Sequence, residues 1–99
     1  MPTPLDAVQL NAALQARPDW EGGPDRIWRT TRLTTDEDAE LRRLVAAAAD
    51  AMDHHPMLED DAGATRWVLW THSTGGVTDL DLALASRIDI LVGQVTGHP

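Results

Sequence analysis

The sequence predicts an α+β fold, a single small domain over residues 1–99 in which helices pack on one face of a small antiparallel sheet. Three segments carry helix-capping signals followed by apolar residues at helical spacing. The segments between them are short and rich in β-branched and aromatic residues, which is typical of strands. The predicted order is α-β-β-α-β-α, and this grouping favours helices packed against one sheet. A chain of 99 residues has the length of one domain with one modest core.

The first helix is predicted close to the N-terminus. Thr3 is expected to cap it, Pro4 suits the first helical position, and Asp6 completes a capping box. The helix is expected to run to about Ala16 and to stop there, because Pro18 follows and cannot continue it.

Two strands are predicted next. Trp20 belongs to a short strand, and residues 22–25, which are two glycines, a proline and an aspartate, form a turn. Residues 27–33 have the β-branched and aromatic composition of a longer strand. The sheet is therefore expected to begin with two strands joined by a tight connection.

The longest predicted helix opens with a capping box formed by Thr34 and Glu37. Acidic residues crowd its first turn, where the helix dipole favours them. The helix is expected to end near His54, because Pro56 disfavours a helical conformation at the residue before it. Its apolar residues recur at the spacing of one buried stripe, which comprises Leu41, Leu44, Val45, Ala48 and Met52.

Residues 57–65 are expected to form an irregular acidic connection, and residues 66–71 form the clearest strand of the chain. This strand is apolar on both faces, which predicts a central position in the sheet or a face covered by a partner. A glycine-rich turn over residues 73–77 follows. Thr78 then caps the last helix, whose apolar stripe comprises Leu84, Ile88, Leu91, Val92 and Val95.

Composition excludes several classes of function. Sixteen acidic residues against eight arginines, with no lysine, give a net charge of −8, which disfavours direct binding to nucleic acid or to an anionic membrane. No cysteine is present, so a disulfide, a thiolate nucleophile and a cysteine zinc site are excluded. The N-terminus lacks the features of a signal peptide, and the longest apolar run, residues 44–49, is too short to span a bilayer. We therefore expect a soluble cytoplasmic protein.

Three of the four histidines lie in two segments, residues 50–56 and residues 71–81, at places where a regular element is expected to end. Histidine is the side chain whose ordinary pKa permits proton transfer near neutral pH. Aspartates lie close to these histidines in both segments. The pattern therefore indicates acid–base chemistry. The fourth histidine, His98, lies in the C-terminal tail and is not expected to take part.

The spacing within these two segments resembles the pterin-4a-carbinolamine dehydratase family. A His-His-Pro motif is followed after fifteen residues by a third histidine, and then by a Gly-Gly-x-Thr-x-x-Asp pattern. The order of the predicted elements is similar as well, so the resemblance covers nearly the whole chain. The matching residues are Asp50, His54, His55, Pro56, Thr71, His72, Gly75, Gly76, Thr78 and Asp81.

The resemblance implies an activity. Members of the family dehydrate a tetrahydropterin that carries a hydroxyl at its bridgehead carbon, giving the quinonoid dihydropterin, in the recycling of tetrahydrobiopterin. It also implies a pterin as the small-molecule substrate, no metal, no organic cofactor, and a homodimer or homotetramer. Some animal members additionally act as dimerisation cofactors of a transcription factor.

The resemblance further implies a site built from three histidines and a carboxylate, His54, His55, His72 and Asp81. Loss of water from a carbinolamine needs a proton for the departing hydroxyl and removal of a ring N–H proton, and histidines supply both without a metal. Our hypothesis makes His54 the main acid/base at the hydroxyl, with His72 assisting and His55 holding the pterin. Asp81 would orient a histidine or bind the guanidine-like edge of the pterin.

Further residues match the binding segments of the family. Asp50 and Asp53 flank the histidine pair and are expected to support it. One departure is that Met57, Leu58 and Ala62 occupy a connection in which the family usually places aromatic residues. This departure keeps a second function open, a catalytically weak or inactive dehydratase-like module for oligomerisation or protein interaction. Substrate contacts are implied for His54, His55, Pro56, Thr71, His72, Ser73 and Thr74.

Plain structural roles are alternatives for several of these residues. His54 and His55 could form a solvated helix end, where a cation is favourable. Asp50 and Asp53 could be acidic residues of the helix that are simply exposed to solvent. Asp81 could serve only to complete the capping box of Thr78, although capping and a role in the site can coexist.

The same residue types also occur in other kinds of site. Three histidines and an aspartate could bind zinc in a metal-binding regulatory protein, but adjacent histidines seldom both reach one tetrahedral ion, so no metal is predicted. Residues 74–76 could hold a phosphate at a helix start, yet a longer glycine fingerprint and a lysine are missing. The four tryptophans are expected in the core or at an interface, and Val68 and Trp70 are the predicted subunit contact.

Overall fold

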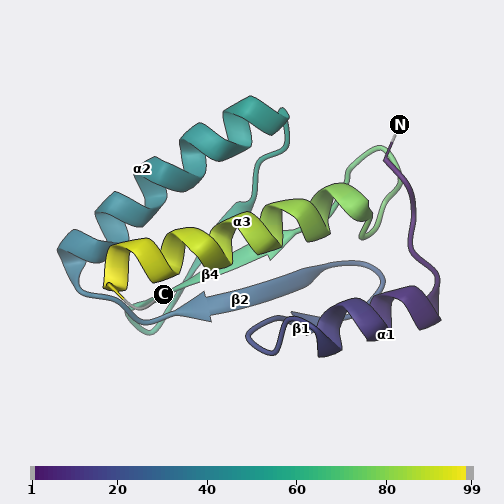
Figure 1. Cartoon of the computed structure of the whole chain (residues 1–99), viewed down its shortest axis with the longest axis horizontal. Coiled ribbons are helices and arrows are strands. Elements are labelled where there is room, and N and C mark those ends of the chain that lie inside the picture. Colours follow the sequence, from purple (N-terminus) through teal and green to yellow (C-terminus); the bar gives the residue numbers. More distant parts are fainter. Residues whose placement is uncertain (1, 98–99) are drawn as a thin grey trace.

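Residues 2–97 are described by a computed structural model of the chain (Figure 1). The four strands form one antiparallel sheet in the order β1-β2-β4-β3. Figure 1 shows α2 and α3 in contact with each other over the sheet. The predicted α+β fold is therefore confirmed. The elements in chain order are α1 (Ala7–Gln15), β1 (Glu21–Gly22), β2 (Ile27–Thr31), α2 (Thr35–Met52), β3 (Met57–Asp61), β4 (Ala64–Leu69) and α3 (Asp79–Thr96).

The core lies between the sheet and the helices. The two central strands contribute Ile27, Trp67 and Leu69, each at most 1% exposed. Complete burial of a side chain of this kind contributes roughly 1.5–3 kcal/mol. The predicted stripes of the two long helices are confirmed, because their residues either lie in this core or pack against it. The helices bury Leu10, Leu41, Val45, Leu84, Ala85, Ile88, Leu91 and Val92.

The prediction of an irregular connection over residues 57–65 is wrong, because most of this segment forms β3 and pairs with β4 along its whole length. The two strands are joined by a two-residue turn, Ala62–Gly63, in which both φ angles are positive, 52° and 88°. Such mirror-image turns match the twist of a hairpin. β3 is the edge strand of the sheet, and charged residues are common on exposed edges. Its acidic composition therefore concealed a strand.

The predicted start of the first helix is also wrong. α1 begins at Ala7, and its N-cap is Asp6, which accepts a hydrogen bond from the Gln9 amide while the Gln9 side chain reaches back. Thr3 lies outside the helix, and its backbone N–H donates to the Asp79 carboxylate at 2.7 Å. The N-terminal segment is thus held by the first turn of α3, and this distant partner competes successfully with the local cap.

The capping boxes of both long helices are confirmed. Thr34 and Glu37 cap α2 reciprocally, and Thr78 and Asp81 do the same for α3. α2 ends at Met52, and its C-cap residue Asp53 has a left-handed backbone, with a φ of 51° and a ψ of 43°. The chain therefore turns sharply immediately before the histidine pair.

β4 occupies a central position between β2 and β3, as predicted. Val68 faces away from the helices, opposite Trp28 on one side and Met57 on the other. It is only 2% exposed within a single chain, so it offers little surface to a second subunit, and the subunit contact stays a prediction. Among residues 2–97, no helix combines the length and the apolar character needed to cross a membrane. His98 lies outside the described residues.

Candidate active site

The histidine pair leaves the end of α2 in two directions. His54 turns inward, and its Nε2 lies 2.6 Å from Oδ1 of Asp81 on α3. His55 turns outward, and its Nε2 lies 2.7 Å from Oδ1 of Asp50, one turn back on α2. The side chain of His54 is 10% exposed, whereas that of His55 is 55% exposed. Each histidine of the pair is therefore oriented by its own carboxylate.

Asp81 is fully buried, with 0% of its surface exposed. Its Oδ2 accepts hydrogen bonds from the backbone N–H of Thr78 at 2.8 Å and from the hydroxyl of Thr71 at 2.9 Å. Its Oδ1 faces the ring of His54. An ionised carboxylate only accepts hydrogen bonds, so Nε2 of His54 is the donor and Nδ1 is the nitrogen left for other chemistry. Capping and orientation of a histidine coexist in this one side chain.

The turn after β4 carries the third histidine. Thr71 closes this turn, because its N–H donates to the carbonyl of Gly76 at 2.9 Å and its carbonyl accepts from the Gly75 amide at 3.0 Å. Gly75 has a φ of 72°, a conformation that favours glycine. His72 is exposed on the turn, and its ring stacks on Trp70 with centroids 4.7 Å apart.

One cavity of about 430 Å³ brings the two segments together. This volume suits a small ligand. Two lining residues, Trp70 and Leu80 at the start of α3, are not among the predicted site residues. Their sequence positions do not show that the turn after β4 lies next to the end of α2. The cavity is lined by Pro2, Asp53, His54, His55, Trp70, Thr71, His72, Ser73 and Leu80.

The remaining predicted residues lie around this cavity without lining it. Asp81 stands behind His54, and Asp50 holds His55. Pro56 lines a neighbouring hollow of about 190 Å³ between α2 and β3. The hydroxyl of Thr74 bonds backbone carbonyls within its own turn.

The alternative sites find little support in this geometry. Within residues 2–97, no three histidine, aspartate or glutamate side chains are grouped so that they could hold a metal ion. The amides of Thr74 and Gly75 both donate to carbonyls of the same turn. They are therefore not aimed at a phosphate.

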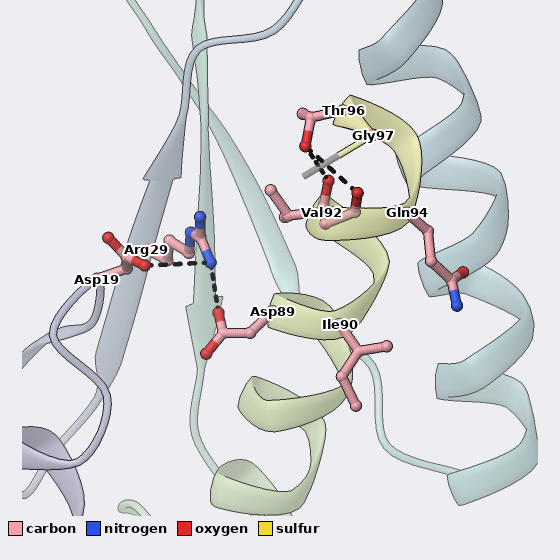
Figure 2. Close-up of a pocket in the computed structure, with 9 residues that line it drawn as sticks. Asp19, Arg29, Asp89, Ile90, Val92, Gln94, Thr96 and Gly97 are labelled. Atoms are coloured by element: carbon pink, nitrogen blue, oxygen red, sulfur yellow. Dashed lines mark hydrogen bonds and ion pairs between the residues drawn. The ribbon is translucent and has the colours of Figure 1, made fainter. Parts of the chain in front are cut away.

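A larger hollow, about 830 Å³, lies elsewhere, beside the C-terminal half of α3. Figure 2 shows Arg29 reaching from β2 to Asp89 on α3, with Asp19 close by. The guanidinium nitrogen lies 2.5 Å from Asp89 and 3.6 Å from Asp19, and the indole N–H of Trp20 donates to Asp89 at 2.8 Å. Among residues 2–97, its lining includes no histidine, the side chain whose ordinary pKa lies near neutral pH.

Fold and cavity together define a small α+β domain with a histidine–aspartate site. Similarity to known proteins identifies the family to which this domain belongs. The chain belongs to the Pterin 4 alpha carbinolamine dehydratase family, whose sequence pattern matches residues 3–91.

Relatives named for the same family are similar over most of the chain. A protein of Mycobacteroides abscessus is 39% identical over 87 residues, which cover 87% of this chain and 93% of the relative. A protein of Paracoccus denitrificans is 37% identical over 94 residues, covering 90% and 86%. The crystal structure of a transcriptional coactivator/pterin dehydratase from Brucella melitensis superposes with a TM-score of 0.84 at 28% identity, covering 92% of this chain and 100% of that one.

Proposed function

We propose that this protein is a 4a-hydroxytetrahydropterin dehydratase, a hydro-lyase that works by histidine acid–base catalysis. The observation that carries the proposal is that three histidines from two distant segments line one cavity, with a fully buried aspartate behind one of them. Membership of the dehydratase family supports the same activity.

The reaction needs two proton movements that are balanced overall. An acid gives a proton to the bridgehead hydroxyl, the C–O bond breaks, and water leaves. The lone pair of the adjacent ring nitrogen forms the new C=N bond, and a base takes the ring N–H proton. The product is the quinonoid dihydropterin, and the enzyme ends with as many protons as it had. Groups that titrate near neutral pH perform both steps efficiently.

The geometry suggests a division of roles. His54 is anchored through Nε2 to Asp81, so its ring is fixed and its Nδ1 remains for the hydroxyl. His72 lines the same cavity from the turn after β4, and we assign it the assisting proton transfer. His55 is exposed and bound to Asp50, which fits a residue that holds the edge of the pterin by hydrogen bonds.

Stopped-flow measurement of carbinolamine dehydration tests the proposal. We expect the wild-type protein to accelerate the reaction, and we expect His54→Ala and His72→Ala each to lower kcat on the order of 10²-fold, as for loss of a placed proton donor. Glu40→Gln, on the exposed surface of α2, is the control. Wild-type rates in both histidine variants would refute the role assignment, and no acceleration by the wild-type protein would refute the activity.

The physiological setting is part of the same proposal. We place the activity in tetrahydrobiopterin recycling in the cytoplasm, with the protein working as a homodimer or homotetramer and without a cofactor. Family membership supports this setting. Light scattering of the purified protein measures the oligomeric state, and a mass of 10.8 kDa would contradict an oligomer.

A second function has one observation in its favour. The similar protein of Brucella melitensis is described as a transcriptional coactivator as well as a pterin dehydratase. An interaction module with weak or no turnover would keep this fold. The dehydration assay separates the two functions, because such a module leaves the rate of the uncatalysed reaction unchanged.

A further inference from the structure

The three histidines of the cavity are held in different ways. His54 and His55 each place one ring nitrogen on a carboxylate, at 2.6 Å and 2.7 Å. The ring of His72 has no hydrogen-bond partner among residues 2–97. It contacts the indole of Trp70, with centroids 4.7 Å apart and ring planes tilted by 36°. Stacking is therefore the contact that orients this third ring.

Trp70 is itself held in place. It is half-buried, follows the last residue of β4 and lines the cavity. The guanidinium carbon of Arg26 lies 4.9 Å from the centroid of its ring, and a cation over an indole face is attracted by the negative charge of that face. Arg26, Trp70 and His72 thus form a connected stack.

The backbone fixes the position of Arg26 relative to the turn that carries His72. The N–H of Val77 donates to the carbonyl of Pro24 at 2.9 Å. A Cβ atom at Gly76 would lie 2.7 Å from the same carbonyl oxygen, so a glycine is needed for this close approach. The turn before β2 and the turn after β4 are therefore tied together, and the stack bridges them.

We infer that Trp70 is a positioning residue for His72, with Arg26 holding the indole in turn. This inference rests on the proposed function. An exposed histidine on a turn samples several rotamers, and a proton donor is effective only when its nitrogen is held within hydrogen-bond reach of the reacting atom. The stack restricts His72 to the rotamer that faces the cavity, as the carboxylates do for the other two histidines.

Kinetics of matched variants test the inference. Trp70→Leu removes the aromatic face, Trp70→Phe keeps one, and Trp28→Leu is the control on the sheet face outside the cavity. We expect Trp70→Leu to lower kcat on the order of tenfold, because misplacing a catalytic group slows the chemical step, and we expect KM to stay within about twofold. Trp70→Phe retains most of the rate, and Trp28→Leu leaves kcat unchanged.

Proton NMR of His72 provides a readout that does not depend on turnover. A ring stacked on an indole has its carbon-bound protons shifted upfield. We expect this shift in the wild-type protein, a smaller shift in Arg26→Gln, and none in Trp70→Leu. Absence of dehydratase activity in the wild-type protein would refute the proposed function, while the NMR shift would still report on the stack.

Three results would overturn the inference. One is a kcat of Trp70→Leu equal to that of the wild-type protein. Another is a raised KM with unchanged kcat in Trp70→Leu, which would mean that the indole binds the substrate instead of orienting a histidine. The third is the absence of an upfield shift of the His72 ring protons in the wild-type protein. This measurement does not depend on any variant being folded.

Discussion

Asp81 and Asp89 lie eight positions apart on α3, about two helical turns, and both accept hydrogen bonds from side chains outside the helix. Asp81 is fully buried and meets an imidazole, a hydroxyl and a backbone amide. Asp89 is partly exposed and meets the guanidinium of Arg29 and the indole of Trp20. Two aspartates on the same helix therefore have different hydrogen-bond partners and different degrees of burial.

The difference lies in what the partners can do with a proton. Guanidinium stays charged at any ordinary pH, and an indole N–H only donates, so neither partner of Asp89 exchanges a proton near neutral pH. The partner of Asp81 is an imidazole, the kind of side chain whose ordinary pKa lies near neutrality. A carboxylate near a hollow is thus a candidate for catalysis when its partner can exchange protons, and among residues 2–97 the partners of Asp89 beside the larger hollow cannot.

Replacement of Asp81 by asparagine should have the largest effect. Its amide oxygen can still accept from Thr78, but the NH₂ group then faces Nε2 of His54 and forces that nitrogen to accept. The acid that protonates the hydroxyl from Nδ1 is the imidazolium, which carries a hydrogen on both nitrogens. A nitrogen that must accept excludes this form, so kcat should fall on the order of 10²-fold. Stopped-flow measurement of carbinolamine dehydration gives the kcat of this variant. Asp79→Asn, in the same first turn of α3, is the control, and equal rates in the two variants would mean that Asp81 only caps the helix.

Asp89→Asn should have an intermediate effect of a different kind. It leaves the partly buried Arg29 without its nearest carboxylate, which should lower the free energy of unfolding by about 1–2 kcal/mol. Urea denaturation measures that loss. The kcat of the folded protein should be unchanged, because this cluster lies away from the histidine cavity. A fall in kcat comparable to that of Asp81→Asn would contradict the comparison.

The smallest effect is expected for an ion pair that is fully in solvent. The hydrogen bond from Arg43 holds the pKa of Glu40 below its usual value. Because the folded-state pKa is lowered, the pair contributes stability above the unfolded pKa and loses it as the pH falls through the folded pKa. Arg43→Ala should raise the pKa of Glu40 toward its ordinary value, measurable by carboxyl NMR titration, with little change in unfolding. A pKa unmoved by this substitution would show that another group lowers it.

The parts of the fold that the sequence predicted depend on short-range contacts. The boxes of Thr34 with Glu37 and of Thr78 with Asp81 each join residues within one turn, so the pattern contains both partners. The prediction that Thr3 caps the first helix is wrong because Thr3 has a long-range partner, Asp79, which lies 76 positions away in the sequence. β3 was not predicted because consecutive acidic residues are typical of a loop in the sequence, whereas an edge strand tolerates them.

The site could be predicted in part for the same reason. His54, His55 and His72 were expected around one cavity, and the cavity contains all three. The spacing of residues could not show which carboxylate each histidine meets, nor that Trp70 would turn toward His72. Such contacts depend on how the end of α2 and the turn after β4 approach each other, which no local pattern encodes.

The acidic composition of β3 has a consequence for how copies of this chain can meet. Glu59, Asp60 and Asp61 lie consecutively along an open border of the sheet. A second molecule adding its own β3 there would bring like charges opposite one another, and such juxtaposition is unfavourable. Self-templated growth of the sheet into fibres is thereby discouraged at this border.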